Sequence, residues 1–284
     1  MMRCRAVSFR LFACAAALVG ITLCAGCKSV PANDVTEIVE PSNDRNWKPY
    51  LATLATAEVH GDNITVHNVR NCTYITADDY IVDHYDKDLQ ISDVQSVDFV
   101  VVPFKHVPTL AHTWLNFGMA DGTYIGVSVE CRLEEDEFYA PLTGVMRQFE
   151  LVYVVADERD LIRLRTRHRQ DDVYVYRTRA TPQQAQELFL GMMERANKLA
   201  REPEFYDTFA NNCTTNIFEH VNQLVPGRVP YNYAVLLPGL ADRYVFDLGL
   251  IDTRRSFEDT KRMARVNDVA ELYYDSHEFS RRIR

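Results

Sequence analysis

Cys213 is the side chain of this sequence that best fits the role of a catalytic nucleophile. It stands in the segment NNCTTNIFEHV, where Asn211 and Asn212 precede a run of apolar residues with helical spacing. Asparagine is a favoured N-cap residue, so the sequence predicts a helix that begins at Cys213 with Asn212 as its cap. The helix dipole favours negative charge in the first turn, and the thiolate is the nucleophilic form of cysteine. We therefore expect Cys213 to attack an acyl carbon, with the free backbone N–H groups of this turn receiving the oxyanion.

His112 is the residue expected to act as general base for that thiol. It lies in the segment LAHTWLNF, an expected strand that is joined to a second strand by an Asp-Gly turn. Alternation along the second strand places Ser128 and Glu130 on one face. If His112 shares that face, Glu130 or Ser128 can hold its second ring nitrogen and fix its tautomer, as a catalytic triad requires. The sequence leaves open which of the two is the third member.

Other side chains with suitable chemistry are less favoured. Ser128 lacks the second glycine of a nucleophile elbow, so a serine hydrolase is not expected. Cys72 precedes no helical pattern, and we expect it either to be buried or to form a disulfide with Cys131 that leaves Cys213 free. The histidines lack metal-ligand spacing, and Cys213 with His220 provides only two ligands. We therefore expect neither a metal site nor a cofactor.

The pattern of apolar residues predicts the elements that carry these side chains. Alternation and continuous β-branched runs indicate six strands, at residues 64–69, 94–104, 110–118, 124–131, 148–156 and 173–176. A capping box formed by Thr181 and Gln184 predicts a helix that ends before Pro203, and a second helix extends from Cys213 to about Leu224. Strands followed by helices indicate an α+β fold, in which an antiparallel sheet packs against helices and the catalytic cysteine lies at a helix N-terminus.

One folded domain is expected, over residues 47–252. The chain has 284 residues, of which 47% are hydrophobic and 25% charged, and this composition is typical of globular proteins. No internal repeat and no linker divides the chain after residue 47. Residues 253–284 are charged and weakly patterned, so we expect them to form a charged C-terminal tail that is helical or partly ordered.

The first 26 residues have the features of a secretion signal. Three arginines precede an apolar run over residues 11–23, and this run is too short to span a bilayer comfortably. The sequence LCAGC at its end resembles the cleavage box of bacterial lipoproteins, so we expect Cys27 to carry a lipid such as palmitate and residues 27–46 to form a tether. Lys28 favours the outer membrane, facing the periplasm. The alternative is an ordinary signal peptide that is cut near Ala25.

The charge of the chain argues against a nucleic-acid partner. There are 31 basic and 40 acidic residues, and without the three arginines of the first 26 residues the 28 remaining basic residues give a formal charge of −12. Such a surface repels phosphate backbones. The expected partners are instead the lipid membrane, through Cys27, and a lipidated or cell-wall substrate.

Three segments in a fixed order resemble the Lnb N-terminal periplasmic domain family. They are AHTWLNF, GVSVECR and FYDTFANNCTTNIFEHV. The family is similar to the circularly permuted branch of the papain-like, NlpC-type cysteine superfamily, in which the histidine strand precedes the cysteine helix. The resemblance covers roughly residues 47–250 and implies a permuted papain-like fold. It also implies Cys213 as nucleophile, His112 as general base and Glu130 as third member, at a position that varies across the superfamily.

The resemblance also implies an activity. The relatives that give the family its name are lipoprotein N-acyltransferases, which would move an acyl chain through a thioester on the cysteine; this chain departs from their pattern because no later stretch is apolar enough to span a membrane. We expect a thiol-dependent acyltransferase or hydrolase of the bacterial envelope. One alternative is a cell-wall peptidase or amidase with the same two residues, which a polar cleft would favour. The other is a non-catalytic envelope lipoprotein, in which Cys213 and His112 would lie far apart or be sealed from solvent.

Overall fold

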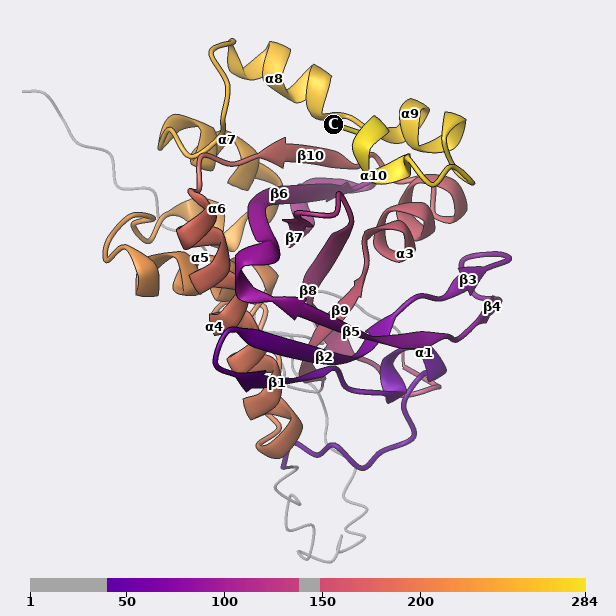
Figure 1. Ribbon diagram of the computed structural model, residues 1–284. Coiled ribbons are helices and arrows are strands. Elements are labelled where there is room, and N and C mark those ends of the chain that lie inside the picture. Colours follow the sequence, from indigo (N-terminus) through magenta and orange to yellow (C-terminus); the bar gives the residue numbers. More distant parts are fainter. Residues whose placement is uncertain (1–39, 138–148) are drawn as a thin grey trace, which may run out of the picture. The chain divides into compact units, whose positions relative to one another are not determined.

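The structure is a computed structural model that describes residues 40–137 and 149–284. The described residues belong to one compact unit, Glu40–Arg284 (Figure 1). The predicted signal peptide (1–26), the predicted lipid attachment at Cys27 and the tether as far as residue 39 lie outside the described residues.

A mixed sheet of eight strands forms the centre of this unit. The strand order is β1-β2-β9-β8-β7-β6-β10, and β5 pairs with β2 outside this path. The pairings are antiparallel except between β2 and β9, which meet at one parallel pair, Arg70 with Ala156. The strands of this sheet are β1 (Thr56–His60), β2 (Asn63–Arg70), β5 (His84–Gln90), β6 (Val94–Phe104), β7 (Val107–Met119), β8 (Tyr124–Arg132), β9 (Glu150–Asp157) and β10 (Tyr174–Arg177). Two short strands, β3 (Thr73–Tyr74) and β4 (Tyr80–Ile81), pair separately.

The α+β class and the expected hairpin are confirmed. Strands β7 and β8 pair antiparallel across the Asp-Gly turn, where Gly122 has a φ of +83°, a value that favours glycine. The continuous β-branched run of β6 is buried over Val97–Val102, as expected for a strand covered on both faces. Each of the six predicted strands overlaps an observed one.

Helices α4 (Pro182–Arg201) and α5 (Cys213–Leu224) cover one face of the sheet. Helix α4 begins with the predicted capping box of Thr181 and Gln184. Its apolar residues at helical spacing are all buried, namely Ala185, Leu188, Phe189, Met192, Met193, Ala196 and Leu199. This apolar stripe packs on β6 and β9 and fixes α5 beside β7 and β8.

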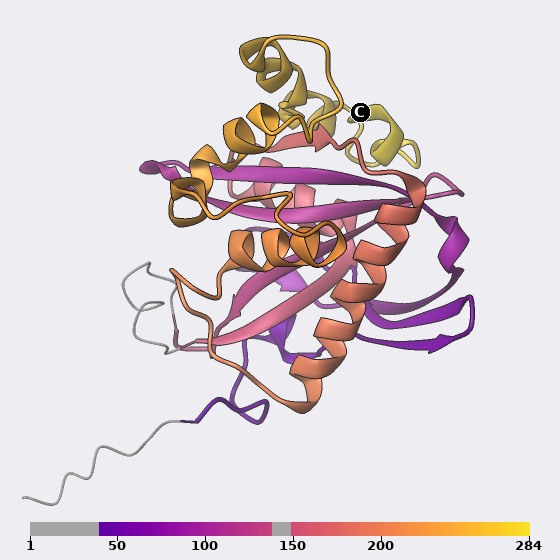
Figure 2. The same ribbon diagram turned by 90° about the vertical axis from the view of Figure 1, so that its left-hand side faces the viewer.

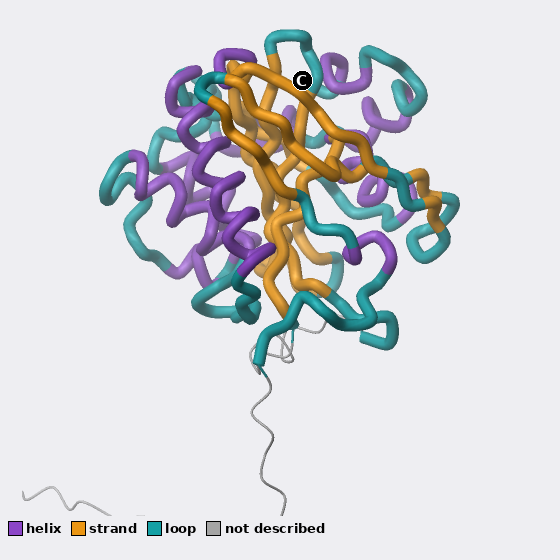
Figure 3. Tube along the Cα trace, turned by 60° about the horizontal axis from the view of Figure 1, so that its bottom comes forward, coloured by secondary structure: helices purple, strands orange, loops and turns teal. Residues whose placement is uncertain are grey.

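Other helices lie against the opposite face or the edge of the sheet, so that the strands form a central layer (Figure 3). Helix α3 (Glu158–Arg163) packs on β8 and β9 and continues into the π-helical turn η2 (Leu164–His168). The remaining short elements are α1 (Pro49–Ala52), η1 (Ile91–Asp93), α6 (Tyr233–Leu236), η3 (Pro238–Leu240), α7 (Ala241–Asp247), α8 (Phe257–Ala264), α9 (Asn267–Leu272) and α10 (Phe279–Arg282). None of the helices in the described parts of the chain has both the length and the apolar composition needed to cross a membrane.

The compact unit extends at both ends beyond the predicted boundaries at 47 and 252. At the N-terminal side, the Asn43 amide donates to the carbonyl oxygen of Leu199 at 2.9 Å and so ties the chain to the end of α4. At the C-terminal side, Phe279 is fully buried, and the Arg284 side chain donates to Asp98 at 2.7 Å. The charges of residues 253–284 therefore belong to short helices that weak periodicity did not reveal: α8 packs on β10, whereas α9 packs on η2 and α10 on α3.

The sheet divides between β7 and β8, and this division positions the site. The two strands pair from Gly118↔Tyr124 to Trp114↔Ser128 and no further. Beyond that point β7 continues with β6 to Val107, whereas β8 continues with β9 to Arg132. Figure 2 shows the two halves of the sheet diverging behind α5. Residues 107–113 and 129–132 consequently face each other across an unpaired gap.

Candidate active site

Cys213 is the first residue of α5, and Asn212 is its N-cap. The Asn212 side-chain oxygen accepts hydrogen bonds from the backbone N–H groups of Thr214 (2.8 Å) and Thr215 (2.9 Å). The Cys213 side chain is 4% exposed, and its Sγ lies 4.0 Å from the carbonyl oxygen of Ala111. Ala111 immediately precedes His112 on β7, so the thiol lies beside the backbone that carries the histidine.

The cap changes the expected oxyanion donors. Two of the N–H groups of the first turn are already bonded to Asn212 and are not free, contrary to the sequence-based expectation. The Cys213 N–H, in contrast, makes no hydrogen bond to any described residue. The same cap that starts the helix therefore bonds the N–H groups that were expected to receive the oxyanion. One backbone donor next to the sulfur remains for a developing oxyanion.

His112 lies on the opposite face of β7 from the side chains that contact α5. The Thr113 hydroxyl is 3.1 Å from that of Thr214 on α5, so alternation directs His112 to the other face. There its ring stacks on Trp114, with a centroid separation of 5.7 Å. Its Nε2 lies 2.7 Å from the Ser128 hydroxyl.

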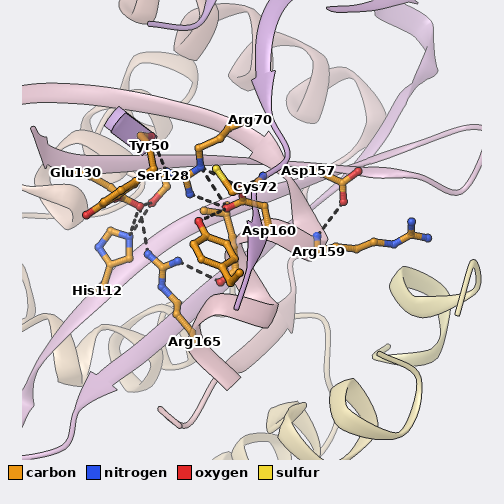
Figure 4. A network of polar contacts seen from close by, with 12 residues as sticks. Tyr50, Arg70, Cys72, His112, Ser128, Glu130, Asp157, Arg159, Asp160 and Arg165 are labelled. Atoms are coloured by element: carbon orange, nitrogen blue, oxygen red, sulfur yellow. Dashed lines mark hydrogen bonds and ion pairs between the residues drawn. The ribbon is translucent and has the colours of Figure 1, made fainter. Parts of the chain in front are cut away.

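Ser128, Glu130 and Arg165 form a chain of polar contacts that begins at His112 (Figure 4). The Ser128 hydroxyl donates to Oε1 of Glu130 at 2.8 Å, and the same oxygen lies 3.6 Å from Nε2 of His112. The Arg165 guanidinium donates to this oxygen at 3.2 Å and lies over the Trp114 ring at 4.7 Å from its centroid. Both predicted candidates for the third position, Ser128 and Glu130, are therefore part of one network with His112.

The charges of this network are fixed by burial and by Arg165. Burial raises the pKa of Glu130, but Arg165 and the hydrogen bond from Ser128 outweigh it and bring that pKa to about 2. Burial, with Arg165 nearby, lowers the pKa of His112 to about 3. At neutral pH Glu130 is thus a carboxylate, Arg165 a cation and His112 a neutral imidazole.

These charges determine the tautomer of His112. An ionised carboxylate can only accept, so the single hydroxyl proton of Ser128 is directed at Glu130. The Ser128 oxygen must then accept from His112, whose Nε2 therefore carries the ring proton. Nδ1 is left with its lone pair, and it makes no hydrogen bond to the described part of the chain. His112 can accordingly take up a proton at Nδ1.

A cavity of about 180 Å³ brings Cys213 and His112 together. It is lined by side chains from both faces of the sheet, since it lies where β7 and β8 have separated. On the side of Cys213 the walls are mainly apolar, with Ala111, Val129, Cys131, Leu133 and Tyr206. On the side of His112 they are polar, with Tyr50, Glu130, Arg165, Arg169 and Asp171. Across residues 40–137 and 149–284 no hydrogen bond joins Cys213 to His112, so the cavity and not a direct contact relates the two.

Cys72, Cys131 and Cys213 are all free thiols, so the considered disulfide between Cys72 and Cys131 is absent. The Cys72 N–H donates to Asp160 at 2.7 Å within a buried network that includes Arg70 and Tyr74. Cys131 instead lines the cavity that holds Cys213. Burial and the neighbouring Cys213 raise the pKa of the Cys131 thiol. Cys72 thus has the buried role that was the other expectation.

Sequence reasoning missed the part of the site that comes from the π-helical turn η2. Arg165 lies in this turn and Arg169 directly follows it, and both line the cavity. Single π-helical turns occur mostly as local irregularities of α-helices, frequently at functional sites, and no apolar period predicts them. The sequence signal that could have predicted a cation here is electrostatic, because the Glu130 carboxylate, if it faces His112 inside the sheet, requires a positive charge nearby.

Metal ligation receives no support from side-chain placement. Over the residues that the structure describes, no three histidine, cysteine or carboxylate side chains gather in a way that could hold an ion. His220 lies on α5 away from the thiol, where its Nε2 is 3.0 Å from the Tyr153 hydroxyl.

Comparison with models of protein families identifies a family to which the chain is similar. The family model described as the Lnb N-terminal periplasmic domain matches residues 82–239, a segment that contains His112, Ser128, Glu130 and Cys213. No curated protein and no solved structure was found to match the chain.

Proposed function

The chain belongs to the Lnb N-terminal periplasmic domain family, and from this we propose that it is a thiol-dependent acyltransferase or hydrolase of the bacterial cell envelope. The family assignment itself indicates an envelope-associated protein. The observation that carries the further step is the cavity between β7 and β8, which Cys213 and His112 both line while the tautomer of His112 leaves Nδ1 open.

In the proposed reaction Cys213 attacks an acyl carbon and forms a thioester. His112 takes the thiol proton at Nδ1, directly or through one water, and later gives it to the leaving group. The oxyanion that forms on the acyl carbonyl accepts a hydrogen bond from the Cys213 N–H. In the second half an amine or water gives its proton to Nδ1 and attacks the thioester carbon; the C–S bond breaks, and the proton on Nδ1 returns to the sulfur to restore the thiol. Ser128 and Glu130 act as positioning residues, because they hold Nε2 and the imidazolium that forms.

The low pKa of His112 makes this proton transfer dependent on the thiolate. Burial keeps the imidazole neutral in the resting protein. A thiolate that forms across the cavity adds a negative charge next to the ring and so offsets the burial of the imidazolium. The proton on Nδ1 is thus stabilised only while the negative charge of the sulfur lies across the cavity.

The position of the histidine before the cysteine supports a permuted papain-like fold. His112 lies on β7 and Cys213 at the start of α5, and an antiparallel pairing links the histidine strand to the strand of Ser128 and Glu130. The proposed fold type is the one in which these three parts converge at a cleft.

A cell-wall peptidase or amidase is the second candidate function, and the polar wall of the cavity favours it. Arg169 and Asp171 present opposite charges on the side of His112, which suits a peptide substrate. The apolar wall beside the sulfur suits an aliphatic acyl group instead. The same nucleophile serves both functions, and they differ in the group that is left on Cys213.

Mass spectrometry of the intact protein separates these functions. We expect incubation with a bacterial envelope extract to add a mass to the wild type and to Cys72→Ala, and to add none to Cys213→Ala. An added fatty-acyl mass supports the acyltransferase or lipid hydrolase, and an added peptide mass supports the peptidase. Equal adducts on Cys213→Ala and the wild type would refute a thioester at this residue.

The proposal includes a lipid on Cys27 that holds the protein at the outer membrane, facing the periplasm. Its support is the sequence LCAGC after an apolar run of signal-peptide length. Cys27→Ser is expected to lose incorporation of radioactive palmitate and to move from the membrane to the soluble fraction, whereas Cys72→Ser is expected to keep both properties. Continued membrane association of Cys27→Ser would contradict the anchor.

A further inference from the structure

A second cavity lies on the α5 face of the sheet and is not used by the proposed reaction. Its volume is about 320 Å³, and its walls come from β6, β7, α4, α5 and the segment that follows α7. Phe99 and Leu115 line it from the sheet, Leu188 from α4, and Ile217 and Val221 from α5. It is about twice the roughly 150 Å³ of an engineered apolar cavity that stays dry and binds benzene.

This cavity is open to solvent and is too large to be a packing defect. Native cores are packed as densely as organic crystals and leave few voids larger than a water molecule. Water does not fill such a space well, because aliphatic and aromatic walls offer it few hydrogen-bond partners. A cavity of this size with apolar walls is typical of a binding site for an apolar ligand.

Two arginines are the charged residues of the cavity lining. The Arg228 side chain is half-buried and donates to the carbonyl oxygen of Leu248 at 3.0 Å, and no carboxylate pairs with it in the described part of the chain. The Arg179 side chain is 52% exposed, and its Nε lies 3.8 Å from Asp252. Both reach solvent, so they stand where the cavity opens, whereas the apolar walls lie further inside.

We propose that this cavity binds a single aliphatic chain that ends in an anionic group. The chain lies among the apolar side chains of β6, β7, α4 and α5, and Arg228, with Arg179 beside it, receives a carboxylate or phosphate at the opening. A neutral apolar ligand would leave Arg228 without a counter-ion. An anionic peptide would leave most of the apolar wall without contacts.

The cavity lies along α5, the helix that begins with the proposed nucleophile. A role for the bound chain in the reaction therefore rests on the proposed function. Ile217 in its wall is four residues after Cys213, a distance of about 6 Å along an α-helix. Leu115 in its wall is two residues beyond Thr113, which contacts the first turn of α5. A bound chain therefore lies against α5, the helix whose first residue carries the thiol. Binding itself, however, does not require the thiol.

Fluorescence of cis-parinaric acid, a carboxylate-headed C18 chain, tests the site in the full chain. We expect saturable binding at one molecule per protein, with the same affinity in Cys213→Ala. Val221→Trp fills the cavity from a half-buried position of α5 and is expected to weaken binding by about tenfold or more, whereas Val59→Trp on the exposed face of β1 is expected to change nothing. Absence of saturable binding, or equal binding by the two tryptophan variants, would overturn the proposal.

Arg228→Gln keeps a donor for the Leu248 carbonyl and removes the charge. It is expected to weaken binding of the acid by about tenfold and to leave binding of its methyl ester unchanged. Arg262→Gln, at a solvent-exposed arginine of α8, is the matched control. A tenfold loss for both acid and ester, or no loss for the acid, would contradict the assigned anion contact.

Displacement of the probe distinguishes the sources of the chain. Displacement by palmitate alone would support a free fatty acid, and displacement by lysophosphatidylglycerol alone a phosphate-headed lipid; displacement by neither would overturn the site. Retention of binding in Cys213→Ala together with absence of any acyl adduct on the wild type would leave this binding site standing while refuting the proposed reaction.

Discussion

The Ser128 hydroxyl lies 2.7 Å from Nε2 of His112 and donates its own proton to Glu130. One hydroxyl group therefore decides which ring nitrogen of the histidine is protonated. The carboxylate does not contact the ring at hydrogen-bond distance, because 3.6 Å separates it from Nε2. The Glu130 carboxylate thus fixes the direction of the Ser128 hydroxyl, and this hydroxyl in turn orients His112.

Ser128→Ala is expected to slow acylation of Cys213 without unfolding the protein. The substitution removes the acceptor for Nε2, so the tautomer with a free Nδ1 loses its advantage. General-base catalysis typically contributes about 10²- to 10⁴-fold, which sets the upper limit of the expected loss. The rate of p-nitrophenol release from p-nitrophenyl butyrate measures the effect, and circular dichroism checks the fold. Ser92→Ala, at an exposed position of η1, is the control. An unchanged rate in Ser128→Ala would show that this hydroxyl does not orient the base.

Local sequence patterns were sufficient to predict the elements that carry the site. The capping box at Thr181, the apolar stripe of α4 and the cap at Asn212 are short-range features, and each fixes one helix start. Alternation along β8 placed Ser128 and Glu130 on one face because the side chains of a strand have a period of two. The hairpin then brought that face to His112.

The relation of His112 to Cys213 could not be predicted from those patterns. Alternation along β7 directs Thr113 to α5 and His112 away from it, and only the end of pairing at Trp114↔Ser128 lets one cavity reach both sides. Where two strands stop pairing depends on the packing of the whole sheet. Likewise, the π-helical turn of Arg165 has no periodic signal, and the C-terminal helices have short apolar faces that are recognisable only once they are packed on β10, η2 and α3.

Iodoacetamide is expected to label Cys213 at least about tenfold faster than Cys72 at pH 7.5. Burial, with Asp160 nearby, raises the pKa of Cys72 to about 11, so almost none of it is thiolate at this pH. Labelling of Cys72 should therefore increase by about tenfold for each pH unit up to that pKa. Peptide mapping after timed labelling measures both rates, with Cys213→Ala to identify the fast site. Faster labelling of Cys72 would contradict the burial that keeps its thiol protonated.

The stability of the protein is expected to fall between pH 7 and pH 5 partly through His112. An unfolded histidine takes up a proton below about pH 6.5, whereas burial keeps the folded His112 neutral down to about pH 3. Because the unfolded state binds the extra proton, the contribution is complete above pH 6.5 and is lost as the pH falls toward 3. Between pH 7 and pH 5, the free energy of unfolding of His112→Asn, whose side chain stays neutral, should fall by about 2 kcal/mol less than that of the wild type. Urea unfolding at pH 7 and pH 5 gives the difference, and equal losses would contradict the buried neutral state.

Arg165 is expected to control the tautomer of His112 through Glu130. The ion pair of Arg165 with Glu130 is largely buried, with side-chain exposures of 5% and 17%. Loss of one partner of such a pair typically costs about 3–5 kcal/mol of stability. Arg165→Met should therefore destabilise the protein, and Glu130→Gln combined with it should recover part of the loss. Urea unfolding of the wild type, the two single variants and the double variant gives the coupling free energy, and additive losses would show that the pair does not act as a unit.

The same substitution should also change the pH dependence of acylation. Without Arg165, burial raises the pKa of Glu130, and a protonated Glu130 donates to Ser128 instead of accepting from it. The Ser128 hydroxyl then donates to Nε2, the ring proton moves to Nδ1, and the base is lost. Arg165→Met should consequently be slow in p-nitrophenyl butyrate cleavage at pH 6 and recover as the pH rises and Glu130 ionises, whereas Arg167→Met, at the half-exposed neighbour in η2, should follow the wild type. A variant that is equally slow at every pH would mean that Arg165 supports the site by packing on Trp114 and not by its charge.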